Sequence, residues 1–363
     1  MVDRPMEISK LIKEYKGKYR ATQSLALLFD GCAIKVFSNS RILIEKLDRY
    51  FGDFKGASLE PDIVVTALET RAPDLNMDFT IKQPDKGKTK IKEEYVDFPS
   101  GRIVRKKLTG MAFLFGGGEN LAVGPCVDND NQVVNFIINR FIQWTLHRGS
   151  LLMHAAGVMS DGRGLAIAGF SGMGKSTLSL HIMNRGVSFI SNDRVMVSAN
   201  GDGVTMRGVP KLPRVNPGTI ISNKSLESIL SPKEREKIRA IPAEKLWDLE
   251  QKYDVFIDDC FGNDKFKLSV RMKALVVLNW RRNSAEFKIR KVNIADRRDL
   301  FPAFTKSVGL FYEPAPLKEP GQDFSDEAYL RLLDNCDVYE MTGGINFDKA
   351  ATACIEIIGQ DRR

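Results

Sequence analysis

Short apolar runs alternate with one helical stretch in the middle and C-terminal parts of the chain. The runs are nearly continuous, which is typical of strands buried on both faces of a sheet. They are SLLMHAAGVMS (150–160), GLAIAGF (164–170), VSFIS (187–191) and SVRMKALVVLNW (269–280). KSTLSLHIMNRG (175–186) predicts a helix that stops at Gly186, and the C-terminal segment 338–359 predicts a strand, a turn and a helix.

In the first part of the chain, the hydrophobic pattern predicts short helices and strands. Residues 6–17 predict a short polar helix, and residues 24–38 predict a hairpin that turns at Asp30-Gly31, because these residue types tolerate positive φ. A helix is expected over residues 40–51, with Ser40 as N-cap and Gly52 as stop. Further strands follow up to residue 124. The pattern indicates a strand-rich α+β region.

Residues 130–149 place apolar side chains three or four positions apart, which predicts a strongly amphipathic helix. This helix leads directly into the apolar strand at 150. With 363 residues the chain is long enough for two domains. We therefore expect an N-terminal α+β domain over 1–129 and an α/β domain with a mixed sheet over 130–363.

Composition changes this picture little. The net charge is +8, but the charges are scattered, which argues against a nucleic-acid partner. The five cysteines are far apart and predict reduced thiols rather than a disulfide framework. No apolar run approaches the ~20 residues of a membrane span, and the N-terminus lacks the apolar core of a signal peptide. The sequence therefore predicts a soluble, cytoplasmic protein without a membrane partner.

The stretch GFSGMGKST (169–177) fits the phosphate-binding loop G-x-x-x-x-G-K-[ST] in full, and it stands between a predicted strand and a predicted helix. Glycines let backbone N–H groups cradle phosphate oxygens, and the helix N-terminus adds positive potential. Lys175 would contact the β- and γ-phosphates of ATP, and Ser176 would ligate Mg²⁺. The expected nucleotide-binding residues are Gly169, Ser171, Gly172, Met173, Gly174, Lys175, Ser176 and Thr177.

Asp193 ends the apolar strand that follows the P-loop helix. The short separation puts the P-loop strand and the acid strand one helix apart, and we expect them side by side in the sheet. An acid there can reach a metal ion, or a hydroxyl that approaches the γ-phosphate. The base-reading N-K-x-D motif of GTPases is missing, as is the distant Asp-Glu pair of motor and transporter ATPases. A helix cap or turn acid is the alternative for Asp193.

Four stretches in this order resemble the HPr kinase/phosphorylases, bacterial P-loop protein kinases with a catalytic domain related to phosphoenolpyruvate carboxykinase, and in particular the group called HprK-related kinase B. They are LLMHAAGV (151–158), GFSGMGKST (169–177), RGVSFISNDRV (185–195) and MRGV (206–209). The resemblance implies a P-loop kinase domain of that type, preceded by a smaller strand-rich domain, and a homo-oligomer. The first 150 residues carry no motif of the family's N-terminal domain.

The resemblance also implies roles for single residues. His154 would lie near the γ-phosphate and bond to Asp193 or to a phosphate oxygen, although an isolated strand histidine is more often a core residue. Arg207 would bind phosphate, or else is a surface arginine. Ser176 and Asp193 would hold Mg²⁺, or Asp193 would orient the acceptor hydroxyl.

Two positions depart from the family pattern. Asn192 precedes Asp193 where the family has a second acid, and Thr205 stands where it has an acid two residues before Arg207. An amide cannot act as a general base at neutral pH. These changes argue against phosphorolysis and against HPr as substrate, but phosphoryl transfer depends mainly on positioning and charge stabilisation.

The stretch GVPKLPRVNPGTI (208–220) combines three prolines with Lys211 and Arg214. Prolines stiffen such a loop, so that it either holds the two cations over an acidic or phosphorylated ligand or serves as a rigid connector.

The sequence thus favours an ATP-dependent kinase with Mg²⁺, in which Asp193, His154, Lys175 and Arg207 act on the transferring group. The acceptor is a protein Ser/Thr or a small-molecule hydroxyl, and the residues leave this open. A non-catalytic ATP-binding switch is the alternative, favoured by Asn192. A nucleic-acid-associated ATPase is a third hypothesis, supported only by the net charge.

Overall fold

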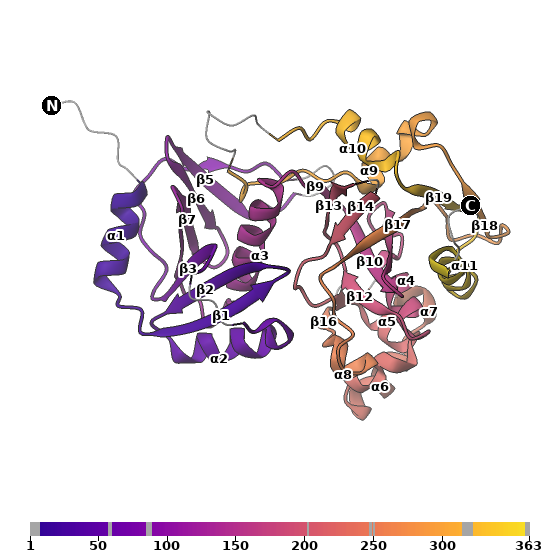
Figure 1. The fold of residues 1–363 in the computed structure, drawn as a ribbon. Coiled ribbons are helices and arrows are strands. Elements are labelled where there is room, and N and C mark those ends of the chain that lie inside the picture. The colour runs from indigo at the N-terminus through magenta and orange to yellow at the C-terminus, as the bar shows by residue number, and fades with distance from the viewer. Residues whose placement is uncertain are drawn as a thin grey trace. The chain divides into compact units, whose positions relative to one another are not determined.

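The computed structural model describes residues 8–56, 60–84, 89–201, 203–246, 249, 251–313 and 322–359. The chain folds into two compact units (Figure 1). The first unit is Met1–Trp144 with Val308–Gly321, and the second is Thr145–Ser307 with Gln322–Arg363. Both units combine helices with sheets, so the protein is a mixed α/β molecule.

This division differs from the predicted boundary at 129/130, because most of helix α3 (Asp130–Leu146) belongs to the first unit. Its Phe136 packs 4.9 Å from Phe113, and its Phe141 packs 5.5 Å from Phe29, measured between ring centroids. The sequence shows which face of the helix is apolar but not which core that face meets. The return of residues 308–321 to the first unit also carries no sequence signal.

Within the described residues, the first unit has an eight-stranded sheet in the order β1-β2-β3-β8-β7-β6-β5-β4. Its strands are β1 (Gln23–Phe29), β2 (Cys32–Ser38), β3 (Ile63–Glu69), β4 (Thr80–Ile81), β5 (Glu93–Phe98), β6 (Gly101–Lys106), β7 (Ala112–Gly116) and β8 (Glu119–Gly124). The helices are α1 (Ile8–Lys18), α2 (Arg41–Tyr50), the 3-10 turn η1 (Gly52–Phe54) and α3.

Strand β7 shows why helices cover both faces of this sheet. Successive strand side chains point to opposite faces. Ala112 and Leu114 share a core cluster with Ile8 and Ile12 of α1. The alternate residues, Phe113 and Phe115, meet Phe136 of α3 and Phe311 from the returning segment.

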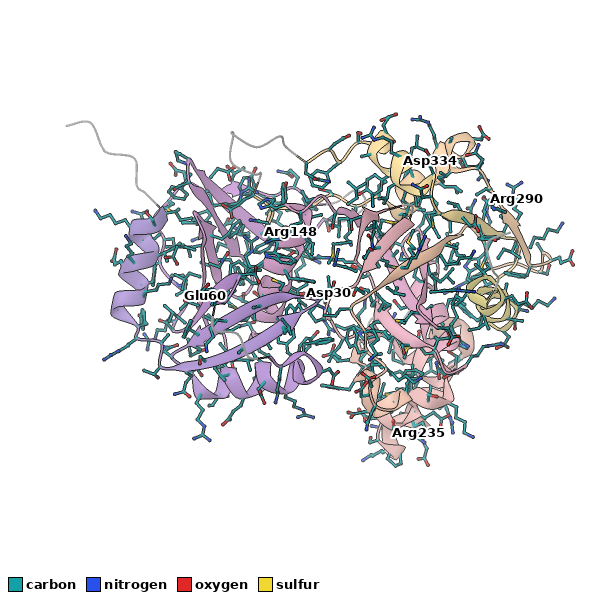
Figure 2. The ribbon with its side chains drawn as sticks, viewed as in Figure 1. Asp30, Glu60, Arg148, Arg235, Arg290 and Asp334 are labelled. Carbon is teal, nitrogen blue, oxygen red and sulfur yellow. The ribbon has the colours of Figure 1, made fainter. Side chains whose placement is uncertain are left out.

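Local signals in this unit behave as expected. Asp30, labelled in Figure 2, and Gly31 take φ values of 46° and 84° and join β1 to β2 as predicted. Ser40 caps α2, since its side chain accepts a hydrogen bond from the backbone N–H of Leu43 at 3.3 Å. The predicted 6–17 helix is α1; residues 6 and 7 lie outside the described part of the chain.

The second unit contains a nine-stranded sheet, again counted over the described residues. Its strands are β9 (Leu151–Met153), β10 (Ala155–Ser160), β11 (Arg163–Gly169), β12 (Ser188–Ser191), β13 (Val195–Asn200), β14 (Gly203–Arg207), β17 (Ser269–Leu278), β18 (Lys288–Lys291) and β19 (Asp337–Thr342). A separate pair is β15 (Arg214–Val215) and β16 (Tyr253–Asp254). The helices are α4 (Lys175–Met183), α5 (Pro217–Ile221), α6 (Pro232–Arg239), α7 (Ala243–Leu246), α8 (Ile257–Phe261), α9 (Phe301–Phe304), α10 (Asp326–Leu333) and α11 (Phe347–Gly359), with 3-10 turns η2 (Lys224–Ile229), η3 (Ile294–Asp296) and η4 (Arg298–Leu300).

The order of the strands corrects one expectation. The P-loop strand β11 and the acid strand β12 are not neighbours, because β10 lies between them in the order β12-β10-β11-β17. A tight turn at Asp161-Gly162 joins β10 to β11 as an antiparallel hairpin, and β17 pairs with the other edge of β11. Both edges of β11 are therefore taken, and β12 pairs with the free edge of β10.

The predicted single strand over 150–160 is also wrong, because it breaks into β9 and β10 at His154. β9 pairs with β13, whereas β10 pairs with β11 and β12. At the break, the backbone N–H of His154 donates to the carbonyl of Phe304 at 2.7 Å. A continuous apolar run cannot reveal this change of partner, which is a tertiary feature.

Two helical layers enclose this sheet. α4 and α11 pack against each other and against β10 and β11. A second core cluster joins Ala166 and Ala168 of β11 to Phe301 and Phe304 of α9 and to Tyr329 of α10. The central strands are thus buried on both faces, as their apolar runs predict.

Two findings concern both units. In the part that the structure describes, no helix combines the length and the apolar character needed to cross a bilayer. The five cysteines, all among the described residues, are free thiols, and only Cys260 is more than slightly exposed.

Candidate active site

The loop between β11 and α4 holds glycines of the GFSGMGKST motif in left-handed backbone conformations. Gly172 and Gly174 take φ values of +80° and +86°, which residues with a side chain rarely adopt. A Cβ atom at Gly174 would also lie 2.9 Å from Cζ of Phe347. The indole Nε1 of Trp280 donates to the Met173 carbonyl at 2.9 Å and fixes the far side of the loop. The glycines of the motif are therefore required by geometry.

Lys175 opens α4 and is buried. Its Nζ donates to the carbonyls of Gly169, at 2.7 Å, and Phe170, at 3.4 Å. Burial lowers the pKa of Lys175 to about 8; the negative charge of Asp193 opposes this shift, and the positive charge of Lys306 adds to it. A desolvated ammonium group that touches only carbonyl dipoles attracts a phosphate strongly.

Asp193 follows β12 and is held from two sides. Nε2 of His154 lies 2.9 Å from Oδ1 of Asp193, and Nζ of Lys306 donates to Oδ2 at 3.1 Å. Burial would raise the pKa of Asp193, but the hydrogen bond from His154 and the charge of Lys306 outweigh it and hold the pKa well below its ordinary range. Asp193 is thus a fixed carboxylate at neutral pH.

The fold brings these residues together at the strand break. Met153 and Thr305 form an isolated antiparallel bridge, which brings the segment that carries His154 beside the segment that carries Lys306. On the other side, the Ser191 hydroxyl donates to the Arg194 carbonyl at 2.5 Å and closes the turn that carries Asp193. Of the two contacts expected for His154, the one with Asp193 is present. Lys306 was not predicted, because FPAFTKSVG carries no motif.

A cavity of about 830 Å³ opens in front of the P-loop. Its lining includes the P-loop from Ser171 to Thr177, together with His154 and Asp193. Cations dominate its charged groups: Lys175, Arg194, Lys211, Arg214, Lys252 and Arg282, against Asp193 as the carboxylate among the described lining residues. The sequence-predicted residues therefore gather around one basic cavity.

Three predicted residues differ in position. Gly169 has no side chain that could bind a nucleotide, and its carbonyl accepts a hydrogen bond from Lys175. The Thr177 hydroxyl pairs with that of Thr219 at 3.0 Å, inside the protein. Arg207 ends β14, opposite Met196 and Ser269, and is not among the described residues that line the cavity. Arg194 and Lys211 occupy the cavity wall instead.

The donor set fits a magnesium ion that a nucleotide carries in. Among the described residues, no three His, Cys, Asp or Glu side chains are arranged to hold a metal. Mg²⁺ commonly uses one or two carboxylates together with substrate phosphates. Ser176 and Asp193 line the cavity, and the buried Oδ1 atoms of Asn192 and Asn216 have no hydrogen-bond partner in the described part of the chain. The hydroxyl of Ser176 and the carboxylate of Asp193 are oxygen groups that suit a hydrated cation.

No protein-family model matches the chain. Curated proteins do match it. One is an HPr kinase/phosphorylase of Exiguobacterium sibiricum, 28% identical over 162 residues, which are 44% of this chain and 48% of the relative. Another is an HPr kinase/phosphorylase of Treponema pallidum, 30% identical over 110 residues, which are 29% of this chain and 34% of the relative.

The chain is similar to HPr kinase/phosphorylases. This confirms the resemblance that the four motifs indicate; the narrower likeness to HprK-related kinase B stays a prediction. The chain spans about half the length, or less, of these curated relatives. Among solved structures, the HPr(Ser) kinase/phosphatase from Coxiella burnetii aligns with 57% of this chain and 99% of its own, at 12% identity and a TM-score of 0.28.

Proposed function

We propose that the chain is an ATP-dependent phosphotransferase with a P-loop kinase domain of the HPr kinase type, which transfers the γ-phosphoryl group to a hydroxyl. The observation that supports this best is the placement of Asp193, fixed by His154 and Lys306, in the cavity that the P-loop lines. A nucleotide-binding loop alone would not need an oriented carboxylate facing the phosphates. The relatives' names agree with a kinase.

The chain's own groups suit a reaction that depends on positioning. Backbone N–H groups of Gly172 and Gly174 and the ammonium of Lys175 would bind the phosphates. Bound Mg²⁺, held by phosphate oxygens with Ser176 and Asp193, would offset charge on the transferring group. His154 and Lys306 keep Asp193 in one orientation.

The low pKa of Asp193 makes it a weak base. We infer that it orients the acceptor hydroxyl or the metal rather than removing a proton before transfer. This suits a loose transition state, in which the nucleophile needs little activation. Asn192 can help only by accepting or donating hydrogen bonds.

The test is transfer of label from γ-labelled ATP to a protein or metabolite in lysate of the source cell, with its small molecules retained. We expect labelled product with the native chain and a loss of about 100-fold in Asp193→Asn, which keeps the shape but not the charge. The affinity for ADP without Mg²⁺, measured separately, should change by less than about threefold. Tight nucleotide binding with no label transferred in several lysates would refute the kinase.

That outcome would favour the second candidate, a nucleotide-binding switch that performs no transfer. Two observations support it. Asp193 supplies the carboxylate among the described residues that line the cavity. Both of its oxygens already have partners, His154 and Lys306. The neighbouring position is an amide, whose Oδ1 is buried. A switch would change its affinity for a partner with the bound nucleotide.

A further inference from the structure

Three of the cations that line the cavity lie outside the P-loop, in the turn after β12 and in the proline-rich loop. Arg194 follows Asp193 in the turn after β12, and Lys211 and Arg214 come from the proline-rich loop after β14. We call Arg194, Lys211 and Arg214 the cationic wall. No step of the proposed function above uses these three residues.

The proline-rich loop is held in place. The backbone N–H of Lys211 donates to the Val209 carbonyl at 2.7 Å, and that of Val255 donates to the Pro213 carbonyl at 2.9 Å. Arg214 lies 3.2 Å from Asp254 across the β15–β16 pair, which anchors the end of the loop. The loop therefore presents its cations from a fixed backbone, beyond what a simple connector requires.

Lys211 is the centre of the wall. It is half-buried, and burial lowers its pKa to about 8. The charges of Arg194, Arg214 and Lys306 act in the same direction, and the charge of Asp193 opposes them. An anion bound among these three cations would offset their mutual repulsion, in addition to the pairing of Arg214 with Asp254.

The nucleotide does not account for this charge. Lys175 would bind the phosphates from the P-loop, and Mg²⁺ would neutralise part of the charge of the triphosphate. Lys306 is paired with Asp193. Lys211 is close enough to Asp193 for the carboxylate to influence its pKa. An anion on the wall would thus lie beside the group that orients the acceptor hydroxyl.

We propose that the cationic wall binds an anionic group which the phosphoryl acceptor carries next to its hydroxyl, so that the acceptor is a small hydroxy acid or phosphorylated alcohol rather than a neutral hydroxyl. This rests on the proposed kinase function. A cavity of about 830 Å³ is in the size range of small-molecule sites, which favours a small acceptor, in which both groups belong to one molecule.

The reaction then balances without another reactant. The acceptor oxygen forms a bond to the γ-phosphorus of ATP, and the bond from that phosphorus to the β–γ bridging oxygen breaks. ADP leaves with the electron pair of the broken bond. The hydroxyl proton passes to solvent, since Asp193 is a weak base.

The test uses three matched probes: glycerol, glycerate and glycerol 3-phosphate. They are titrated by calorimetry into the full chain saturated with Mg²⁺ and a non-hydrolysable ATP analogue, so that the P-loop is filled. We expect one or both anionic probes to bind more tightly than glycerol by about tenfold or more. The better probe tells a carboxylate site from a phosphate site.

Two variants distinguish a specific anion site at the cationic wall from general attraction by the positive charge of the cavity. Lys211→Met should weaken binding of the anionic probe about tenfold, and Lys252→Met, which removes a charge from the same cavity, by less than about threefold. Affinity for the ATP analogue reports folding in each variant. If Lys211→Met fails this check, Arg214→Gln takes its place with the same expectation.

Equal binding of glycerol and the anions, binding of anions only when the P-loop is empty, or equal effects of Lys211→Met and Lys252→Met would overturn the inference. With ATP in place of the analogue, transfer only to neutral hydroxyls would also overturn it and leave the kinase intact. Anion binding as expected, without transfer here or in lysate, would overturn the acceptor role and the kinase proposal together.

Discussion

Asp193 owes its properties to residues that are far away in the sequence. Its oxygens meet His154 at 2.9 Å and Lys306 at 3.1 Å, and its side chain keeps 46% of its surface exposed toward the cavity. Each contact stabilises the ionised form. The carboxylate therefore stays charged, oriented and accessible, which a carboxylate on a mobile loop would not.

Removing the charge of Lys306 tests this arrangement. In Lys306→Met we expect the pKa of Asp193 to rise toward its ordinary value of 3.8, because one charged hydrogen-bond partner is lost. The measurement is a pH titration of the Asp193 carboxyl carbon by NMR. Lys306→Arg keeps the charge and should keep the pKa low.

The same variant has a defined effect on stability. A depressed pKa in the folded state stabilises the protein above the unfolded pKa, and this stabilisation is lost as the pH falls through the folded pKa. Lys306→Met should therefore lower the free energy of unfolding at neutral pH, by about 1 kcal/mol or less, because Asp193 is half-exposed. The difference should shrink in acid; an equal loss at all pH values would contradict this account.

The pKa of Lys175, about 8, predicts a pH dependence of nucleotide binding. Phosphate favours the charged lysine, so the Kd for ADP should rise above about pH 8, by up to about tenfold per pH unit. The titration is best made in the Lys211→Met background, since burial also lowers the pKa of Lys211 to about 8. Lys175→Arg stays charged and should flatten the profile; a flat profile for Lys175 itself would contradict the prediction.

At the scale of elements, the site depends on where strands end. β11 ends at the P-loop, β12 ends two residues before Asp193, and the break between β9 and β10 leaves His154 between two strands. Residues just beyond the end of a strand are not part of the backbone pairing of the sheet, so their side chains can converge on one ligand. The junction of β11 and α4 is the most constrained of these points, because Gly174 is close to Phe347 of α11.

Gly174→Ala and Gly186→Ala separate backbone strain from steric conflict. Both glycines have φ near +87°, but a Cβ at Gly186 meets nothing within 4 Å, whereas at Gly174 it meets Phe347. We expect Gly186→Ala to cost about 1 kcal/mol of unfolding free energy and Gly174→Ala about 2–3 kcal/mol, with loss of nucleotide binding. Chemical denaturation measures both.

A double variant completes this comparison. Phe347→Ala removes the ring that the new Cβ would meet, so it should be less damaging in the Gly174→Ala background than alone. Strictly additive costs would show that Phe347 is not the obstacle.

At the scale of the molecule, the chain leaves the first unit and returns to it. Phe311 packs between Phe113, Phe115 and Phe136, and its carbonyl accepts a hydrogen bond from the buried Arg140. The first unit is thus completed by a segment that follows most of the second. Neither unit corresponds to a continuous stretch of sequence.

Phe311→Ala should therefore destabilise the first unit, by about 3 kcal/mol, because it removes an aromatic ring from a packed cluster. We expect a lower melting temperature by calorimetry. The ADP affinity at a temperature where the variant is folded should change by less than about twofold, since the P-loop belongs to the second unit. An unchanged melting temperature would contradict the role of this segment.

Local signals made much of the fold predictable. The hairpin at Asp30-Gly31, the Ser40 cap and the P-loop each depend on a few adjacent residues whose backbone preferences are strong. The apolar runs also identified the buried strands. The predictions were wrong where the packing or pairing partners of an element are set by distant parts of the chain. These cases are the neighbours of β11, the single strand over 150–160 and the boundary before α3.

The sequence by itself determined the glycine-rich loop between strand and helix and the buried strands, because motif spacing and local conformation decide these features. The family resemblance suggested that His154 bonds to Asp193 or to a phosphate oxygen, and the tertiary structure decided for Asp193. Only the tertiary structure decided that Lys306 is the second partner of Asp193, that Arg194, Lys211 and Arg214 share one cavity wall, and that Phe311 completes the first unit. These contacts join residues that are distant in the chain. They arise from strand order and chain return, which the hydrophobic pattern does not encode.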